Sequence, residues 1–366
     1  MMLFFSFSFL APVANCDDKM PVFSDYDYLP ISNTEVANNL EPITSSGTFP
    51  NLEENPQDFI LEIKKIKIPG HPSAFNPAIT RWNGELLLSF RTYDQRGRTD
   101  GIGIVWLDEH FNVASKTYLL EIRNESPSAS HIKQDPYLLS VGDKLYIIYS
   151  NMMDGTMIRR VFLAELHFDG NAFYIENPEC LSHFPGENER RWEKNWVPFD
   201  YQGNLLLSYS IFPHMVLQPL LGMSSCIPLA STKSAIEWNW GHLRGGSPAL
   251  SLGDEYLAFF HSSKNMQTAQ SKGKNITHYF MGAYTFSSKP PFAITKISPN
   301  PIIGKDFYNG VAHKTWKPLH VVFPRGFVMD DQYIWVSYGR QDFEMWVVKL
   351  DKKGLLNSLV PVSSSE

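Results

Sequence analysis

A short hairpin-like segment recurs five times along the chain, and this repetition restricts the fold more than any other feature. Each copy has a first run beginning at or beside a proline, then a turn, then a second apolar run. The second runs are GELLLSFR (84–91), DKLYIIYS (143–150), GNLLLSYS (203–210), DEYLAFFH (254–261) and DQYIWVSY (331–338). The prolines are Pro77, Pro136, Pro198, Pro248 and Pro324, so successive copies are 59, 62, 50 and 76 residues apart.

This spacing leaves room in each copy for about two further strands of ordinary length. Turn signals such as Asn83-Gly84 lie where hairpins need them, and no long segment shows a helical period. Sheets repeated in this way close radially into a β-propeller, where each blade protects the edges of its neighbours. We therefore predict an all-β fold, a five-bladed β-propeller over residues 61–356 with an N-terminal extension. A β-sandwich with unrelated hairpins is the alternative.

The N-terminal extension divides into two parts by composition. Residues 1–15 are apolar, too few to span a bilayer, and resemble a signal or lipoprotein-like segment. If they are a signal, the protein is secreted, periplasmic or lipid-anchored; otherwise it is cytoplasmic. Residues 16–60 form an acidic arm, since residues 17–58 carry nine acidic side chains and one basic one. Such an arm can wrap the domain or a neighbouring subunit, which leaves a homo-oligomer open.

The charge and cysteine content narrow the class of partner. The net charge is −6 and no basic stripe occurs, so we expect no nucleic-acid partner. We also expect no transmembrane span. The three cysteines, Cys16, Cys180 and Cys226, form neither a disulfide framework nor a zinc pattern, although a Cys180–Cys226 bridge stays open. We expect no metal and no cofactor.

In a propeller the first strand of each blade lines a central funnel. Polar residues beside the five prolines, and just beyond the second runs, should therefore gather around one axis. Those to which we assign a role are Asn76, Arg91, Asp94, Arg98, Asp135, Arg159, Arg160, Lys194, Asn195, Trp196, Arg244, His261, Tyr338 and Asp342. Carboxylates, cations and aromatic rings in one site suit a small anionic or polyhydroxyl ligand.

Each of these residues also has an ordinary structural explanation. Asp94 and Asp100 can cap turns, as aspartates at strand ends commonly do. Arg159 and Arg160 alternate along a strand, so we expect one of the two to face solvent. The same kind of polar residue in all five copies is a stronger signal than any single position.

Several motifs resemble glycoside hydrolase family 130. They are FNPAI…GELLLSFRTYD, QDPYLL, EKNWVPF, GGSPAL…YLAFFHSS, YFMGAYTF and VVFPRG…YIWVSYGRQD, in the order of that family and over about residues 68–350. The family consists of five-bladed propellers that act on β-mannosides, mainly as inverting phosphorylases with some hydrolases. Related glycosyltransferases share the architecture.

The resemblance implies roles at the matching positions. Asp94 is similar to the proton-donating aspartate, although the local alignment can slide to Asp100. Asp135 resembles the aspartate that binds the glycone, and Lys194 the lysine that faces the nucleophile. The resemblance places His261 and Asp342 near the sugar. Tyr137 is a departure, because an arginine that helps to bind phosphate occupies that position in the family.

We therefore expect a carbohydrate-active enzyme that cleaves β-mannosidic or similar linkages by an inverting mechanism. Asp94 is the expected catalytic residue, and inorganic phosphate or water is the nucleophile. If it is phosphate, the expected phosphate-binding residues are Lys194, Arg159, Arg160 and Arg98. If it is water, a second carboxylate must act as base, from among Asp342, Glu187, Glu189 and Glu193.

The remaining candidates are expected to bind the oligosaccharide or glycan substrate: Asn76, Arg91, Asp135, Asn195, Trp196, Arg244, His261, Tyr338 and Asp342. Two other functions stay open. One is a glycosyltransferase that builds β-mannosides in the same funnel. The other is a propeller that binds glycans without catalysis, which the departure at Tyr137 keeps open.

Overall fold

The protein is built almost entirely of β-strands. The computed structural model describes residues 49–93, 99–123, 133–152, 158–181, 192–311 and 319–364. Within these ranges the single helix is α1 (Lys352–Ser358), which begins where the Asp351 carboxylate accepts a hydrogen bond of 2.6 Å from Gly354 N. The predicted signal-like segment at 1–15 and most of the predicted arm at 16–60 lie outside the described residues.

Three of the sheets have the four strands that the repeat spacing predicts, in antiparallel order. The first contains β2 (Phe75–Trp82), β3 (Glu85–Tyr93), β4 (Thr99–Leu107) and β5 (Tyr118–Leu119). The second contains β12 (Val197–Tyr201), β13 (Asn204–Ser210), β14 (His214–Leu220) and β15 (Ser225–Thr232). The third contains β23 (Val322–Met329), β24 (Tyr333–Arg340), β25 (Glu344–Asp351) and β1 (Ile60–Ile66).

Two sheets are larger than predicted because connecting segments add strands to them. The six-stranded sheet contains β6 (Glu121–Arg123), β7 (Lys133–Val141), β8 (Lys144–Met152), β9 (Arg159–Phe168), β10 (Phe173–Glu176) and β11 (Glu179–Cys180). The seven-stranded sheet contains β17 (Arg244–Gly245), β18 (Leu250–Leu252), β19 (Glu255–Met266), β20 (Ile276–Ser287), β21 (Ile294–Ile297), β22 (Leu319–His320) and β26 (Val360–Pro361). A separate ribbon pairs β16 (Ser234–Ala235) with β27 (Ser363–Ser364).

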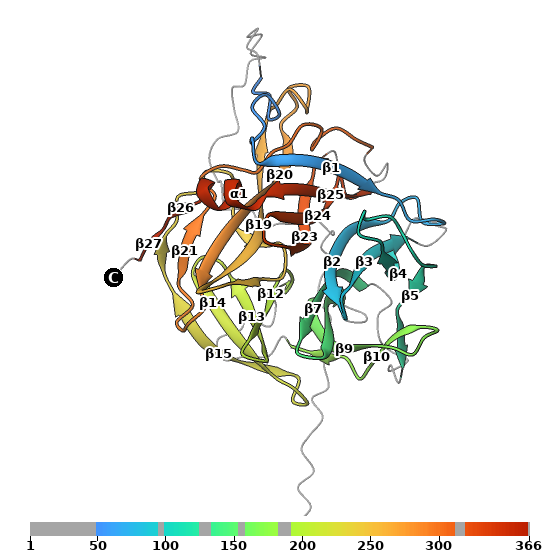
Figure 1. The fold of residues 1–366 in the computed structure, drawn as a ribbon. Helices are drawn as coiled ribbons and strands as arrows, with labels where there is room; N and C mark the ends of the chain where they lie inside the picture. The colour runs from blue at the N-terminus through green and yellow to red at the C-terminus, as the bar shows by residue number, and fades with distance from the viewer. Residues whose placement is uncertain are drawn as a thin grey trace, which may run out of the picture.

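These sheets have a β-propeller arrangement. The inner strands β2, β7, β12 and β23 come together at the centre of Figure 1, and the outer strands lie at the periphery. The N-terminal strand β1 is the outer strand of the sheet that also contains β23, β24 and β25 from the C-terminal part of the chain. This pairing joins the two ends of the chain within one sheet.

All five hairpins predicted from the repeat are confirmed. They are the pairs β2–β3, β7–β8, β12–β13, β18–β19 and β23–β24. The prolines, however, do not all lie at the first residue of a strand, as we expected. Pro77, Pro136 and Pro324 lie inside their strands at register shifts. A β-bulge tolerates proline because the ladder is already interrupted there, and it also turns a side chain in a new direction.

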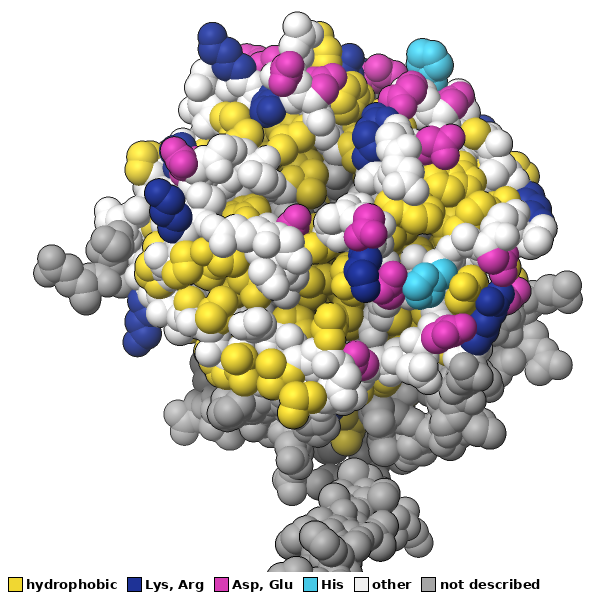
Figure 2. Space-filling view, turned by 60° about the horizontal axis from the view of Figure 1, so that its bottom comes forward, with side chains coloured by type: hydrophobic (Ala, Val, Ile, Leu, Met, Phe, Trp, Pro, Cys, Tyr) yellow, Lys and Arg dark blue, Asp and Glu magenta, His cyan; other side chains and the backbone are white. Residues whose placement is uncertain are grey.

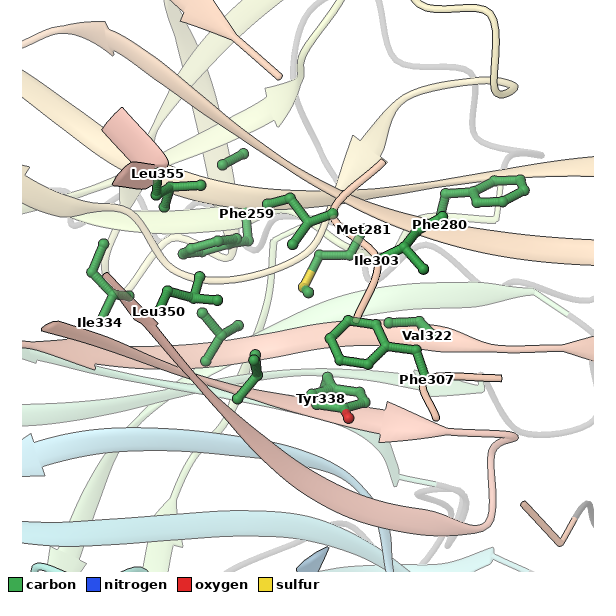
Figure 3. Packing of buried hydrophobic residues seen from close by; sticks show 14 of the residues in the cluster. Phe259, Phe280, Met281, Ile303, Phe307, Val322, Ile334, Tyr338, Leu350 and Leu355 are labelled. Carbon is green, nitrogen blue, oxygen red and sulfur yellow. The ribbon is translucent and has the colours of Figure 1, made fainter. Parts of the chain in front are cut away.

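Buried apolar side chains fill the space between neighbouring sheets. Figure 3 shows one such cluster, in which Phe259 lies close to Leu350, and to which Met281 and Ile334 also belong. Leu355 of α1 is also part of it and is fully buried, so the helix covers one end of this cluster. The cluster therefore joins the seven-stranded sheet to the sheet that contains β1.

Inner strands of neighbouring sheets approach so closely that one of them requires glycine. A Cβ built on Gly326 of β23 would lie 2.5 Å from Ile79 N and 2.6 Å from Ile79 O of β2. These are backbone atoms, which cannot rotate away. We expect Gly326→Ala to destabilise the fold by about 2 kcal/mol or more, since overpacking typically costs 1–3 kcal/mol.

Chemical unfolding of Gly326→Ala beside Gly101→Ala checks this expectation. Gly101 lies on β4, and a Cβ there would meet no atom within 4 Å. Its substitution should change the free energy of unfolding by less than about 0.5 kcal/mol. Equal stability of the two variants would contradict the close approach of β2 and β23.

The structure also bears on two other predictions from the sequence, which concern the disulfide bridge and a membrane span. No disulfide joins Cys180 to Cys226, so the bridge left open by the sequence is not formed. Among the described residues, no helix has the length and apolar character needed to cross a bilayer.

Candidate active site

A cluster of polar side chains lies where the inner strands meet, and we call it the hub. It consists of Asn76, Arg91, Asp135, Asn195 and Arg325, all of which are buried. Three of them have positive φ values: 52° at Asn76, 54° at Asp135 and 64° at Asn195. Non-glycine residues rarely adopt this conformation, and it is concentrated at functional sites. Asn76 and Asp135 lie at the bulges beside Pro77 and Pro136, and Asn195 comes from the segment just before β12.

The Asp135 carboxylate is the common acceptor of the hub. Its Oδ1 accepts a hydrogen bond of 2.8 Å from Asn76 Nδ2 and one of 3.1 Å from Arg91 Nη1. The Arg91 guanidinium lies 4.4 Å from the centre of the Phe75 ring. Asn76 Oδ1 and Arg91 Nε are buried but have no hydrogen-bond partner among the described residues. Buried polar atoms usually have partners, so these two are candidates for ligand contacts.

Arg325 lies next to Asp135 and is completely buried. It donates one hydrogen bond to the backbone oxygen of Asp135 and another, of 3.4 Å, to Asn195 Oδ1. Its guanidinium lies 3.6 Å from the centre of the Tyr137 ring. We assigned Arg325 no role from the sequence, although its place at the bulge beside Pro324 is the signal that could have identified it. It contributes charge to the site without being exposed to a ligand.

The charges around Asp135 determine its protonation state. Burial alone would raise the pKa of Asp135, but the nearby charges of Arg91, Arg325 and Lys194 lower it well below the ordinary carboxyl range. Asp135 is therefore a carboxylate at any ordinary pH. It can accept hydrogen bonds from ligand hydroxyl groups, but it cannot donate a proton.

Asp342 has the opposite character. Burial raises its pKa to about 6, Arg91 and Lys194 oppose this shift, and the charge of Asp135 adds to it. Its side chain nevertheless remains partly open to solvent. Arg91 and Lys194 thus lie within electrostatic reach of both aspartates, although Asp342 follows Asp135 by more than 200 residues. Two carboxyl groups with separated pKa values are a common feature of acid–base sites.

His261 lies beside the hub and is also buried. Its Nδ1 is 2.9 Å from Gly245 O, and its ring is perpendicular to that of Phe323 at 4.5 Å. Burial lowers its pKa well below 6.5, and the charges of Arg244 and Lys194 lower it further. His261 is therefore neutral at neutral pH. Arg244 is the register partner of His261 where β17 pairs with β19.

Arg159 and Arg160 are both buried, which corrects our expectation that one of them faces solvent. Arg159 donates a hydrogen bond to Gln134 Oε1, and its guanidinium lies 5.2 Å from the centre of the Trp192 ring. Arg159 O accepts a hydrogen bond of 3.1 Å from Glu193 N. The two arginines thus lie beside the segment that carries Lys194.

Two predicted substrate-binding residues are part of the hydrophobic core. Trp196 is 1% exposed, packs against Tyr209 and donates a hydrogen bond of 3.1 Å to Glu193 Oε2. Tyr338 is fully buried and packs against Phe307 at 5.0 Å. Both side chains support the site from within rather than presenting a surface to a ligand.

Several predicted residues lie outside the described residues. They are Asp94 and Arg98, together with Glu187 and Glu189. The side chain of Asp100 is likewise not described, although its backbone belongs to β4.

The face of the molecule drawn in Figure 2 has a surface of mixed character. Figure 2 shows one face of the molecule, on which acidic, basic and hydrophobic side chains are interspersed without a continuous basic area. Arg81 and Glu109 are an example of a solvent-exposed ion pair, with bonds of 2.8 and 2.9 Å.

Comparison with solved structures shows a glycoside hydrolase family 130-like fold. One similar structure comes from work on the GH130 family of mannoside phosphorylases, which contains glycoside hydrolases that target β-1,2-mannosidic linkages in Candida mannan. It is 14% identical, with a TM-score of 0.59 over 90% of this chain and 99% of that one. A β-1,2-mannobiose phosphorylase from Listeria innocua is 16% identical, with a TM-score of 0.53 over 81% and 92% of the two chains.

A mannose phosphorylase from Leishmania mexicana, in complex with a phosphate ion, is 11% identical. Its TM-score is 0.52 over 83% of this chain and 92% of that one. No protein-family model matches the sequence. No curated protein matches it either.

Proposed function

We propose that the protein is a carbohydrate-active enzyme that cleaves β-mannosidic or similar linkages with inversion at the anomeric carbon. The observation that carries this proposal is the convergence of Asn76, Arg91, Asp135 and Asn195 on one buried point, with Asp342 nearby. A permanent carboxylate with adjacent amide and guanidinium groups is suited to holding sugar hydroxyl groups in a fixed orientation. The fold similarity to mannoside-active enzymes agrees with it.

We propose inorganic phosphate as the nucleophile. The hub and its surroundings contain the cations Arg91, Arg325 and Lys194, with Arg159 and Arg160 nearby, against the carboxylate of Asp135 and the partly protonated Asp342. This excess of positive charge favours an anionic co-substrate. Tyr137 occupies the position at which family members have an arginine. The guanidinium of Arg325 lies beside the Tyr137 ring and supplies a positive charge there.

In the proposed reaction a phosphate oxygen attacks the anomeric carbon from the face opposite the leaving group. The bond between that carbon and the glycosidic oxygen breaks, and the leaving oxygen takes a proton from Asp94, directly or through a sugar hydroxyl. The products are an α-glycosyl phosphate and the shortened glycan. Asp135 cannot be the acid, because it stays ionised.

An incubation of the protein with β-mannooligosaccharides, with and without inorganic phosphate, tests this proposal. We expect mannose 1-phosphate in the presence of phosphate and little free mannose. Free mannose in equal amount under both conditions would show hydrolysis instead. Absence of both products would contradict cleavage of β-mannosides.

The variant Asp94→Asn tests the proton donor in the same assay. Turnover should fall by about 10²–10⁴-fold, the range for loss of a general acid, while circular dichroism shows an intact fold. Full activity of this variant would remove Asp94 from the mechanism and direct attention to Asp100.

We also propose to count the five sheets of four or more strands as five blades around this site. Each of them contains a strand from one of the five proline-containing segments of the repeat. An experimental structure that places one of these sheets away from the common axis would contradict this count.

A further inference from the structure

The turn between β24 and β25 has a backbone conformation that its own residues disfavour. Gln341 has a φ of 57° and Asp342 a φ of 49°, and Phe343 N donates a hydrogen bond of 3.1 Å to Arg340 O. Positive φ at both central residues is the pattern of a type I′ turn, which strongly favours Asn-Gly. In a residue with a Cβ, this conformation costs roughly 1–2 kcal/mol.

Other hairpins of this chain avoid much of this strain. The turns at Asn83-Gly84 and Gln202-Gly203 have positive φ at both residues, but glycine occupies the second position of each. The pair Gln341-Asp342 has no glycine and no asparagine. Something outside the turn must therefore hold it in this conformation.

The side chain of Gln341 provides that support. It is 2% exposed, and its Oε1 accepts a hydrogen bond of 2.9 Å from Val321 N. Its Nε2 donates a hydrogen bond of 2.7 Å to Tyr308 O and lies 2.9 Å from His320 Nδ1. The backbone N of Gln341 also donates a hydrogen bond of 3.0 Å to Val321 O. Gln341 thus fastens the turn to two segments outside the hairpin.

The segment that receives Gln341 is itself fixed. The Glu53 carboxylate accepts hydrogen bonds of 2.8 Å from the backbone N of Asp306 and of Tyr308. The ring of Tyr308 is buried, and its hydroxyl donates a hydrogen bond of 2.9 Å to Tyr279 O. The Tyr308 carbonyl is therefore a rigid acceptor for Gln341.

The side chain of Asp342, in contrast, makes no hydrogen bond with any described residue, so no bond of its own compensates for the strain. It lies instead within the electrostatic reach of Arg91, Asp135 and Lys194. Strained residues that their surroundings force into position are concentrated at sites where a side-chain direction matters for function.

We propose that Gln341 is a positioning residue that holds the strained turn so that the Asp342 carboxyl group points into the hub and meets the substrate. This inference rests on the proposed function for its substrate, but the orientation of Asp342 can be tested without one. The glutamine is needed because glycine or asparagine would relax the turn without fixing its direction.

The variant Gln341→Gly tests the catalytic consequence, and Gln202→Gly is the matched control. Both replace a glutamine at the first central position of a turn with positive φ, but the side chain of Gln202 is exposed and makes no side-chain hydrogen bond among the described residues. Gln341→Gly should lower kcat/KM for mannooligosaccharide phosphorolysis by about 100-fold, the usual effect of a misplaced group. Gln202→Gly should change it by less than about twofold.

The pH profile separates positioning from a general structural effect. In the wild-type protein the titration of Asp342 near pH 6 should appear in the profile. In Gln341→Gly the carboxyl group is released to solvent, so that limb should move toward pH 4, the ordinary value for aspartate. A kcat/KM within threefold of wild type, with an unchanged profile, would overturn the proposal.

A stability measurement gives the second readout and needs no substrate. A raised pKa means that Asp342 destabilises the fold above about pH 6, and that this cost disappears below pH 4. Asp342→Asn should therefore raise the melting temperature at pH 7.5 by about 3 °C and leave it unchanged at pH 4. In the Gln341→Gly background the same substitution should have no effect at either pH.

The comparison of the two backgrounds isolates Asp342, because the other charged and titratable groups are present in both. Near the turn these are His278, His320 and Glu53, and the groups that face Asp342 from other elements are Arg91, Asp135 and Lys194. An equal gain from Asp342→Asn in both backgrounds would overturn the proposal even if the protein cleaves no mannoside. A protein without turnover that shows the predicted difference would instead contradict only the proposed function.

Discussion

The substitution Asp135→Asn should unfold the protein at markedly lower denaturant concentration and also abolish its activity. Asn keeps the shape of the side chain and can still accept the hydrogen bond from Asn76. Among the described residues, it removes the carboxylate that pairs with Arg91, whose Nη1 lies 3.1 Å away, and it removes the charge beside Arg325. Breaking a buried ion pair by removing one partner costs about 3–5 kcal/mol, so we expect a loss near the lower end of this range.

The pH dependence of this loss follows from the direction of the pKa shift. The folded protein holds the pKa of Asp135 below its ordinary value, so the stabilisation is present above the unfolded-state pKa and is lost as the pH falls through the folded-state pKa. The difference between wild type and Asp135→Asn should therefore stay constant from pH 5 to pH 8. It should shrink only in stronger acid.

Urea unfolding at pH 5 and pH 8 measures this difference, and Asp330→Asn is the control. Asp330 is exposed, and its Oδ1 accepts hydrogen bonds of 2.7 Å from Gln332 N and Tyr333 N without a buried cation nearby. Its substitution should cost less than about 0.5 kcal/mol. If Asp135→Asn were no more destabilising than Asp330→Asn, the hub would not be the buried charge cluster described here.

The second large effect is expected at Glu344, in the sheet that joins the two ends of the chain. Its Oε2 accepts a hydrogen bond of 2.7 Å from Arg340 Nε and one of 3.1 Å from Trp346 Nε1, and its Oε1 pairs with Lys65 of β1. The side chains of Arg340 and Glu344 are 8% and 7% exposed. Glu344→Ala leaves the Arg340 guanidinium buried without its anion and should destabilise the fold by about 3–5 kcal/mol.

The exposed pair Arg81–Glu109 is a matched control for this effect. Its geometry is also bidentate, but its side chains are 44% and 69% exposed. Because water screens such a pair, Glu109→Ala should cost less than about 1 kcal/mol. Thermal unfolding at pH 7 compares the two variants. Equal losses of stability in the two variants would mean that the Arg340–Glu344 pair is not shielded from water as its burial indicates.

Low pH should reduce the loss of stability caused by Glu344→Ala. Burial raises the pKa of this carboxyl group, but the hydrogen bonds from Lys65, Arg340 and Trp346 outweigh burial and leave it below the ordinary value. The stabilisation is therefore present above the unfolded-state pKa and is lost as the pH falls through the lower folded-state value. Wild type and Glu344→Ala should converge only in acid.

Much of the propeller could be predicted from local patterns. The five hairpins follow from alternating apolar runs and from turns such as Asn83-Gly84, both of which depend only on neighbouring residues. The extra strands could not be predicted in this way. The pairing of β6 with β10 and of β22 with β20 is parallel and joins short segments without a pattern of their own.

The site was predictable in part for a similar reason. Asn76 and Asp135 precede prolines in the repeat, so their place near the axis followed from the repeat itself. Trp196, predicted to bind substrate, is buried in the hydrophobic core, and a large aromatic ring looks the same in a sequence whether it binds a sugar or fills a core. Arg325 received no role, because its importance comes from contacts with Asp135 and Tyr137 in another sheet.

The sequence by itself determined the class of fold and the place of Asn76 and Asp135 beside the repeated prolines, because hairpin pairing and side-chain alternation are local properties. Only the tertiary structure decided the protonation of Asp135 and Asp342, since two chemically identical carboxyl groups differ through the cations, burial and neighbours that distant segments bring to them. It also decided that a strained turn carries Asp342, because the bonds that hold Gln341 come from residues about 20 and 33 positions away.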